Sequence, residues 1–346
     1  MSTGNSGTGR RRWASRATLL AVASLVFSVP ALAHAAPGAI PLSESPGALA
    51  ASLQCSANVR TATQEPVLLI PGTASTPQGS FGRTLIPDLQ KNRTPFCQVT
   101  LPQTNTGDVQ RNAEYVVHAV RSMHAMSGRK VQLIGWSQGG GPMPRWALKY
   151  WPDIRPMVDN LIALDPDNAG TAVLDIFGCG IVNLFCTPAI WQQRPTSNFI
   201  RTLNAGAMTY PNVNYTVIFV NLSNFIQPSM NGESQRLPAG PNVTNIGIQD
   251  FCGGLASSPP DHATVVDNPV AMAMISSVLA RPGKPLNLQT VNRQTCGRIG
   301  SELAKVAGPL VQNYFTTFTQ TIPQYGGVPA EPPLRCYARP GPGCKR

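Results

Sequence analysis

Charged side chains are scarce in this sequence. Asp, Glu, Lys and Arg make up only 12% of its 346 residues, whereas 42% are hydrophobic. An intrinsically disordered chain has the opposite balance, so that class is excluded. The sequence also lacks internal repeats of solenoid length, and beyond its first forty residues it lacks an apolar run long enough to span a membrane. We therefore expect a globular chain with a sizeable core.

The few charges are mostly basic, with 27 Lys and Arg against 16 Asp and Glu. No basic cluster is interleaved with aromatic residues, so a nucleic-acid partner is not expected. Four arginines precede the apolar stretch Ala17–Val29, and small-x-small cleavage sites follow it. This order predicts a secretory signal peptide over residues 1–35 and an extracellular protein. The alternative is an uncleaved anchor, which the short apolar stretch disfavours. The remainder, residues 36–346, is expected to form one domain and a monomer.

Eight cysteines are present, but none forms a CxxC pair and histidine is too sparse near them for a zinc site. No metal is therefore expected. Oxidised cysteines are usual in exported proteins, so we expect four disulfides. Their pairing stays open on the sequence alone, although two pairs are close enough for local links, Cys179 with Cys186 and Cys336 with Cys344.

Short apolar runs that alternate with helical patterns predict a parallel α/β sheet. Buried strands are predicted at 66–70, 131–134, 161–164 and 214–220. Helices are predicted at 109–126, 144–151, 269–279 and 299–317. The segment 36–65, rich in Ser, Ala and Pro, is expected to wrap the surface.

Ser137 lies in a G-x-S-x-G sequence, GWSQG at 135–139, between a predicted strand and a predicted helix. A serine on such a turn has a strained backbone, and the flanking glycines remove Cβ atoms that would collide there. The amide of Gln138 then lies at a helix N-terminus, where it stabilises an oxyanion. We therefore predict that Ser137 is a nucleophile. The alternative is an ordinary glycine-rich helix N-terminus.

Only four histidines are available as the base that a serine nucleophile needs. His34 belongs to the predicted signal peptide. His118 and His124 precede the nucleophile on a predicted helix, where a structural or solvated role is expected. In strand–turn–helix hydrolases the base follows the nucleophile along the chain, which selects His262. The second oxyanion donor is predicted at Gly72-Thr73, directly after the first strand, through the backbone N–H and hydroxyl of the threonine.

Several short segments occur in an order that is typical of one lipase family. They are LLIPGT (68–73), NAEYVVHAV (112–120), GWSQGGG (135–141), Pro166-Asp167 followed by Gly170-Thr171, WQQ (191–193), IQP (226–228), DHA (261–263) and YARP (337–340). By these motifs the chain resembles the Candida antarctica lipase B family of α/β-hydrolases, from about residue 50 to the C-terminus.

The resemblance implies an α/β-hydrolase fold, cleavage of carboxylic esters and no cofactor. The site residues that it implies are the nucleophile Ser137, the base His262, the oxyanion-hole backbone groups of Thr73 and Gln138, the alcohol-pocket residue Trp136 and the cleft residue Asp167. It also implies the disulfides Cys55–Cys97, Cys252–Cys296 and Cys336–Cys344. Cys179 and Cys186 are additional to the family pattern.

The resemblance does not supply the acid of a catalytic triad. The family's acid directly precedes the IQP segment, where this chain has Ser223-Asn224 and no carboxylate. The acids between the nucleophile and the base are Asp153, Asp159, Asp165, Asp167, Asp175, Glu233, Asp250 and Asp261.

Asp165 is our prediction for the acid, because it closes the strand next after that of the nucleophile, where sites form in open parallel sheets. Leu164-Asp165-Pro166 is also similar to pancreatic-type lipases, whose acid follows this earlier strand. Three alternatives stay open: Asp165 caps a turn, Glu233 is the acid, or Asn224 orients a Ser–His pair that has no acid.

The sequence thus predicts a secreted serine esterase or lipase that acts on ester or lipid substrates through an acyl-enzyme. The alternatives are a catalytically impaired relative that binds lipids or surfaces, and a hydrolase of the same fold that cleaves polyesters or amides. Four large apolar residues lie between Cys179 and Cys186. They predict a lid around 171–190 and contact with a lipid–water interface. The alternative for this cluster is packing on the core.

Overall fold

The computed structural model describes residues 40–177, 179, 186–253, 261–298, 320 and 322–339. Three predicted features lie outside these residues: the signal peptide over 1–35, the helix over 299–317, and the apolar residues 180–185 of the lid. The elements described below belong to one unit, residues 33–346. In the described part of the chain, no helix combines the length and the apolar character that a membrane crossing requires.

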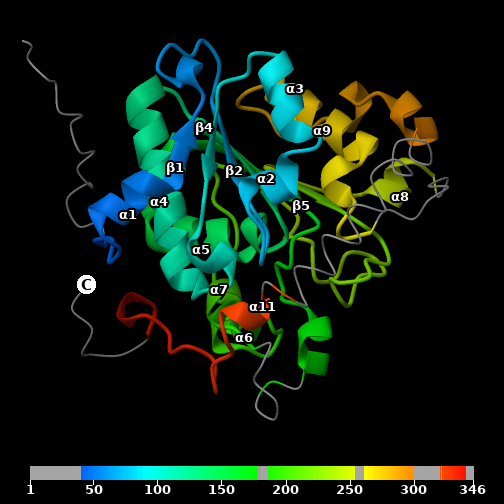
Figure 1. Cartoon of the computed structure of the whole chain (residues 1–346). Helices are drawn as coiled ribbons and strands as arrows, with labels where there is room; N and C mark the ends of the chain where they lie inside the picture. The colour runs from blue at the N-terminus through cyan, green and yellow to red at the C-terminus, as the bar shows by residue number, and fades with distance from the viewer. Residues whose placement is uncertain are drawn as a thin grey trace, which may run out of the picture. The chain divides into compact units, whose positions relative to one another are not determined.

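Seven strands of the described residues form one sheet, in the order β1-β3-β2-β4-β5-β6-β7 (Figure 1). The strands are β1 (Leu53–Cys55), β2 (Val67–Ile70), β3 (Phe96–Val99), β4 (Val131–Trp136), β5 (Val158–Leu164), β6 (Asn214–Phe219) and β7 (Val243–Gly247). Only the β1–β3 pairing is antiparallel. Because β4, β5 and β6 are parallel neighbours, the segments that follow them meet at one edge of the sheet.

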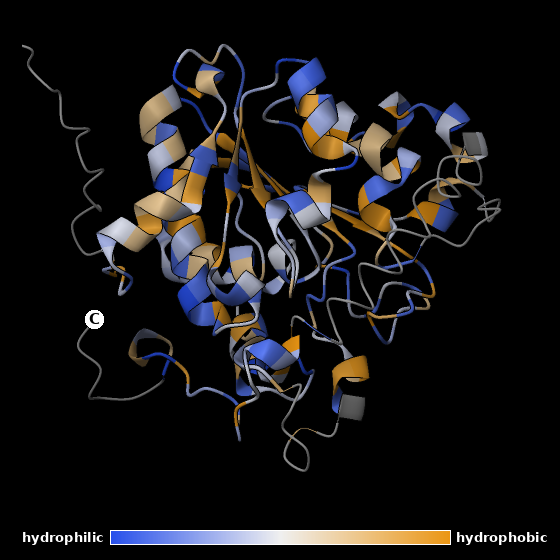
Figure 2. Ribbon diagram, in the orientation of Figure 1, coloured by the Kyte–Doolittle hydropathy of each residue, from blue (hydrophilic) through white to orange (hydrophobic). Residues whose placement is uncertain are grey.

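The central strands β2, β4 and β5 are buried along their whole length because helices cover both faces of the sheet. Figure 2 shows these strands as predominantly hydrophobic. Successive side chains of β2 enter opposite layers, as the two-residue period of a strand requires. Leu68 and Ile70 pack in one buried cluster, whereas Val67 and Leu69 pack in another.

The helices are α1 (Pro46–Ser52), α2 (Pro77–Phe81), α3 (Leu85–Lys91), α4 (Val109–Ser127), α5 (Pro142–Tyr150), α6 (Pro188–Gln192), α7 (Asn198–Asn204), α8 (Ile248–Phe251), α9 (Pro269–Leu279) and α11 (Ile322–Gln324). Helices α4, α5 and α7 pack on one face of the sheet, and α3 and α9 pack on the other (Figure 1). Helix α4 is capped at its N-terminus by Asp108, whose carboxylate accepts the Gln110 N–H, and at its C-terminus by Gly128 in the left-handed conformation.

The four predicted strands are confirmed as β2, β4, β5 and β6, and three predicted helices as α4, α5 and α9. The described part of 36–65 lies mostly at the surface, as predicted, but it also forms the elements α1 and β1, which were not predicted. Strands β3 and β7 were also not predicted. Strands β1 and β7 are partly exposed edge strands that have mixed polar and apolar residues. Their pairing depends on a neighbouring strand rather than on an apolar run of their own.

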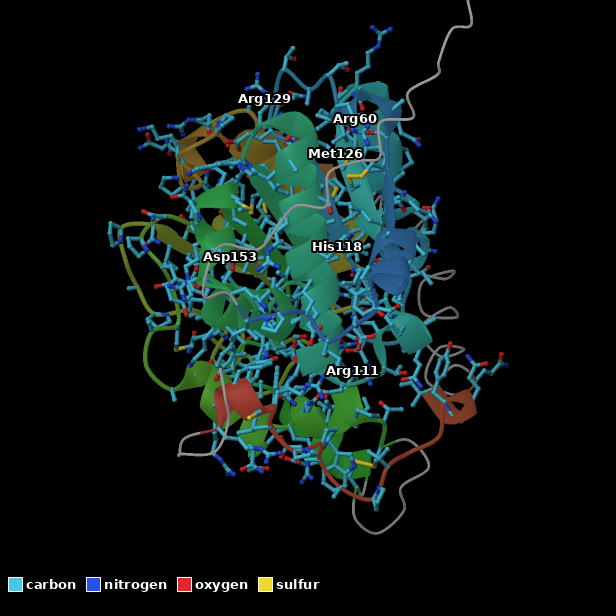
Figure 3. The ribbon with its side chains drawn as sticks, turned by 90° about the vertical axis from the view of Figure 1, so that its left-hand side faces the viewer. Arg60, Arg111, His118, Met126, Arg129 and Asp153 are labelled. Carbon is cyan, nitrogen blue, oxygen red and sulfur yellow. A yellow bond between two sulfur atoms is a disulfide. The ribbon has the colours of Figure 1, made fainter. Side chains whose placement is uncertain are left out.

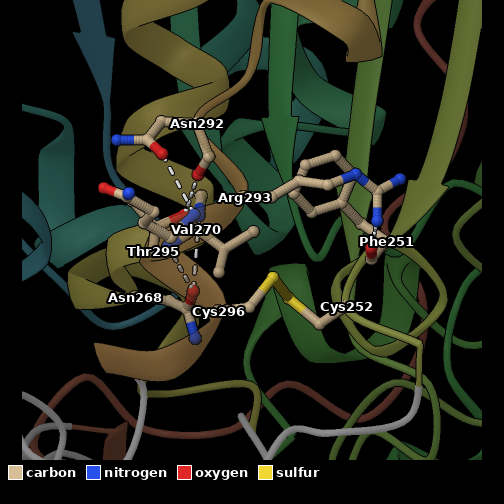
Figure 4. The surroundings of a disulfide bond; sticks show 10 residues. Phe251, Cys252, Asn268, Val270, Asn292, Arg293, Thr295 and Cys296 are labelled. Carbon is tan, nitrogen blue, oxygen red and sulfur yellow. Dashed lines mark hydrogen bonds between the residues drawn. A yellow bond between two sulfur atoms is a disulfide. The ribbon is translucent and has the colours of Figure 1, made fainter.

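Three disulfides join described residues, namely Cys55–Cys97, Cys179–Cys186 and Cys252–Cys296. The first links β1 to β3. Figure 4 shows the third, beside which the Arg293 guanidinium stacks on the ring of Phe251 at 4.6 Å. This disulfide joins the end of α8 to the segment that follows α9. The implied partner of Cys336, Cys344, lies outside the described residues, so that pairing stays a prediction.

Candidate active site

Ser137 lies on a tight turn between β4 and α5, at the start of a short 3-10 helix, Ser137–Gly139. Its φ of +56° is in the left-handed region, as the strained turn predicts. A Cβ atom added to Gly135 would lie 1.9 Å from the Gly139 carbonyl oxygen, and one added to Gly139 would lie 2.3 Å from the Pro71 carbonyl oxygen. The glycines are therefore required by close backbone approach, and the turn places Ser137 at the carboxyl edge of the sheet.

Ser137, His262 and Asp165 form one hydrogen-bonded chain. The Ser137 Oγ lies 3.0 Å from His262 Nε2, and His262 Nδ1 lies 2.8 Å from Asp165 Oδ2. The three residues are 4%, 2% and 0% exposed, respectively. With Nδ1 donating to the carboxylate, Nε2 is left to accept the Ser137 proton. The structure therefore brings together the three residues that the sequence selects as nucleophile, base and acid.

Asp165 directly follows β5, which is the parallel neighbour of the strand that precedes Ser137. From there its carboxylate reaches the His262 imidazole. Of the other seven candidate acids, Asp167 is described below and six contact different groups. Their contacts are Asp153 with Arg121, Asp159 with Gln132, Asp175 with Arg194, Glu233 with the Asn231 N–H, Asp250 with Asn221, and Asp261 with the Thr264 N–H. Among the described residues, Asp165 is thus the carboxylate that reaches the ring of His262.

The two predicted oxyanion residues lie side by side next to Ser137. The Gln138 Nε2 donates to Thr73 Oγ1 at 3.1 Å and to the Asn105 carbonyl at 3.0 Å. Thr73 Oγ1 donates in turn to Gln193 Oε1 at 3.1 Å. The side chain of Gln138 therefore holds the loop after β2. The backbone N–H of Gln138 lies at the turn directly after Ser137, and it is this group that the sequence predicts as an oxyanion donor.

Asn105 was missed by the sequence analysis. Its Nδ2 donates to the carbonyls of Pro71 and Gly72 at 2.9 and 3.2 Å, and its Oδ1 accepts from Asn112. These bonds fix the loop that carries Thr73. No motif or apolar pattern marks Asn105 in the sequence. Gln193, which accepts from the Thr73 hydroxyl, does lie in a recognised motif, the WQQ segment.

Two neighbours hold the backbone of His262, and a third packs on its imidazole. Trp136 donates its indole N–H to the His262 carbonyl at 2.9 Å, and Asn224 Oδ1 accepts the His262 backbone N–H at 3.1 Å. The Phe225 ring stacks on the imidazole with centroids 5.2 Å apart. Trp136 thus has a positioning contact with His262, and its implied role in an alcohol pocket stays a prediction.

The histidines of α4 have local partners. Figure 3 shows His118 on the outer side of the molecule, with Arg111 and Met126 on the same helix. Its Nε2 lies 3.4 Å from Ser122 Oγ, and burial lowers its pKa. His124 Nδ1 bonds the Arg129 carbonyl at 2.8 Å. Both contacts agree with the structural or solvated role that the sequence predicts for these residues.

Asp167 is fully buried, and in the described part of the structure neither of its carboxyl oxygens has a hydrogen-bond partner. Burial raises the pKa of Asp167 to about 7, and the nearby charge of Asp165 adds to the increase. The Arg145 guanidinium and the residue's own backbone act in the opposite direction. Its implied place at the substrate cleft stays a prediction.

We expect Asp167→Asn to make the protein more stable at pH 8 than the wild type. The folded wild type keeps its proton up to about pH 7, whereas the unfolded chain releases it near pH 4. Between about pH 4 and pH 7 the native wild type therefore binds more protons than the unfolded chain does. Its free energy of unfolding should fall as pH rises through this range, by an amount on the order of 4 kcal/mol. Asparagine carries no titrating proton, so the variant avoids this loss. Urea unfolding of both proteins at several pH values between 4 and 8 measures the difference.

The control for this experiment is Asp88→Asn, which changes an exposed acid on α3. Its unfolding free energy should follow the wild-type curve across the same pH range. Parallel curves for the wild type and Asp167→Asn would show that Asp167 does not hold a proton in the folded protein.

The described residues contain no group of three or more His, Cys, Asp or Glu that is arranged to hold a metal ion.

No family model matches the chain. Lipase B of Pseudozyma antarctica is 32% identical to it over 238 residues, which are 68% of each chain. The chain belongs to the lipase B family. The crystal structure of Aspergillus fumigatus lipase B matches with a TM-score of 0.76 and 30% identity, over 88% of this chain and 74% of that one. The mature Bacillus licheniformis lipase BlEst2 matches with a TM-score of 0.50 and 15% identity, over 62% of this chain and 92% of that one, and supports the fold alone.

Membership of the lipase B family confirms the α/β-hydrolase fold and the class of reaction. The mostly parallel sheet with helices on both faces is the architecture that the sequence predicts. The chain is a lipase-like carboxylic ester hydrolase, and its substrates are esters or lipids.

Proposed function

We propose that this lipase B family member is a secreted serine esterase or lipase that cleaves esters through an acyl-enzyme, with Ser137, His262 and Asp165 as its catalytic triad. The observation that carries the proposal is the buried chain of hydrogen bonds from Ser137 Oγ through His262 to Asp165. A relative that had lost catalysis would have no reason to keep this alignment, which argues against the impaired alternative.

In the first step the Ser137 oxygen attacks the ester carbonyl carbon while His262 Nε2 takes the serine proton. Asp165 accepts the Nδ1–H bond and thereby fixes the tautomer and stabilises the imidazolium that forms. The backbone N–H groups of Thr73 and Gln138 bind the negative oxygen of the tetrahedral intermediate, and the Thr73 hydroxyl joins them when its proton turns from Gln193 Oε1 to the oxyanion. His262 then gives its proton to the leaving alcohol, and the acyl group stays on Ser137.

In the second step a water molecule attacks the acyl-enzyme. His262 accepts a proton from the water, and the same oxyanion donors stabilise the second tetrahedral intermediate. When this intermediate collapses, His262 returns the proton to the Ser137 oxygen and the carboxylic acid leaves. Every proton in the cycle passes through His262 Nε2, so the cycle needs no cofactor.

The disulfides support secretion, because such bonds persist in oxidising compartments. The Cys179–Cys186 bond closes a small loop in the segment where a lid is predicted. Contact of this segment with a lipid–water interface remains part of the proposal.

Two measurements test the acyl-enzyme proposal. A fluorophosphonate probe should label the protein stoichiometrically, and peptide mapping should place the label on Ser137. Rapid mixing with a p-nitrophenyl ester should give a burst of nitrophenol close to one equivalent if deacylation is the slower step, since the acyl-enzyme accumulates. A protein that binds emulsified ester but takes up no label would instead be the impaired relative.

A further inference from the structure

We propose that Ser223 is a positioning residue that holds the Asp165 carboxylate in place for His262. This inference rests on the proposed function, because it concerns the acid of the same triad. Ser223 is fully buried in the loop after β6 and lies 58 positions from Asp165 in the sequence. Its hydroxyl donates to Asp165 Oδ2 at 2.8 Å, the same oxygen that accepts the His262 Nδ1–H bond.

The direction of the Ser223 proton is fixed by the hydroxyl's other contacts. Its oxygen accepts the backbone N–H of Ile226 at 3.1 Å and that of Phe225 at 3.4 Å. These bonds use the lone pairs of the oxygen and leave its single proton for the carboxylate. The loop's own turn therefore aims the Ser223 proton at Asp165.

The second oxygen of Asp165 is held from the same side. Oδ1 accepts the Val220 N–H at 3.0 Å and the Gln235 Nε2–H at 3.3 Å. Asp165 also has a φ of +42°, a strained conformation that persists only where the surroundings enforce it. Apart from His262, the donors to this carboxylate are Val220, Ser223 and Gln235, which all lie in the segment 220–235. The side chain on β5 is thus anchored to the end of β6.

The two residues that follow Ser223 contact His262, the partner of Asp165 in the triad. Asn224 Oδ1 accepts the His262 backbone N–H, and the Phe225 ring stacks on the imidazole. Three consecutive residues therefore fix both ends of the Asp165–His262 bond. This arrangement makes the loop after β6 a support for the triad rather than a simple connection.

Ser223→Ala removes the directed hydroxyl and leaves Oδ2 with the imidazole alone. The lost hydrogen bond is one to a charged carboxylate, and such bonds are stronger than those between neutral groups. Without it, kcat should fall about tenfold to a hundredfold. KM should stay within about twofold, because Ser223 acts through Asp165 and does not contact the substrate. Steady-state hydrolysis of a soluble p-nitrophenyl ester separates the two constants.

The matched control is Ser229→Ala, which changes another buried serine of the same loop. Ser229 Oγ accepts from the side chain of Gln227 and donates to the Ser223 carbonyl, so its partners do not include Asp165. We expect its kcat to stay within about threefold of the wild type. If Ser223→Ala does not fold, Ser223→Cys gives the same comparison, because a thiol of similar size is only a weak donor.

The decisive measurement is a double-mutant cycle with Asp165→Asn. If Ser223 acts through the carboxylate, Ser223→Ala should lower kcat in the wild type and should change it less than about threefold in the Asp165→Asn background. Equal losses in both backgrounds, or a wild-type kcat in Ser223→Ala, would overturn the positioning role. Near-normal activity of Asp165→Asn itself would instead refute the proposed triad, so the two failures are distinguishable.

Discussion

Ser137→Ala should lower kcat for ester hydrolysis by about a million-fold, and it should abolish labelling by a fluorophosphonate. Removal of the nucleophile from a serine triad has a cost of about this size, because the base and the acid then have no group to activate. Alanine tolerates the φ of +56° at this position no worse than serine does, so the fold should persist. The measurement is the initial rate with p-nitrophenyl butyrate at high enzyme concentration.

The control for this change is Ser80→Ala, at another buried serine in α2. Ser80 hydrogen bonds with Ser75, not with His262. Its variant should keep wild-type turnover and should still be labelled. Residual activity of Ser137→Ala above about a thousandth of the wild type would show that the attacking group is not Ser137.

Asp165→Asn should lower kcat by about ten-thousand-fold while the protein stays folded. The asparagine amide has nearly the same shape, but it carries no charge to stabilise the imidazolium and favours the wrong tautomer of His262. The measurement is kcat with the same soluble ester, together with a circular dichroism melting curve that shows an intact fold.

Asp159→Asn is the matched control, because it changes another buried acid of the same strand, at the opposite end of β5. Its carboxylate bonds the Gln132 side chain and the Gly283 N–H. Turnover should stay within about threefold of the wild type. If Asp165→Asn also keeps near-normal turnover, a Ser–His pair oriented by Asn224 becomes the better account of the site.

Local sequence patterns sufficed where one segment contains all of the physical requirements. The glycines that flank Ser137 are needed by backbone contacts that a strand–turn–helix always makes, so GWSQG predicts the turn directly. The apolar runs at 67–70 in β2 and 161–164 in β5 identify strands buried on both faces. His262 was selected because few histidines exist and only one follows the nucleophile.

Sequence patterns failed where a residue's role depends on a distant neighbour. Strand β1 has no apolar run of its own, since it is an edge strand that pairs with β3 and is joined to it by Cys55–Cys97. Asn105 braces the loop that carries Thr73, yet it belongs to no recognisable motif. Such contacts form only when the chain has brought the partners together.

The proposed triad acid illustrates both what the sequence can predict and what depends on the tertiary structure. The sequence by itself determined the fold class, and it predicted Ser137 as nucleophile, His262 as base and, among eight carboxylates, Asp165 as the acid for its place at a strand end. Only the tertiary structure showed which carboxylate reaches His262 Nδ1, at 2.8 Å across 97 positions of the sequence. It also showed that Ser223 and Asn224, where the family has its acid, contact the acid and the base from the end of β6. The parallel strands β5 and β6 are neighbours and end at the same edge of the sheet. An acid that follows β5 is therefore within reach of donors that follow β6. The order of strands in the sheet sets this adjacency, and local sequence does not contain it.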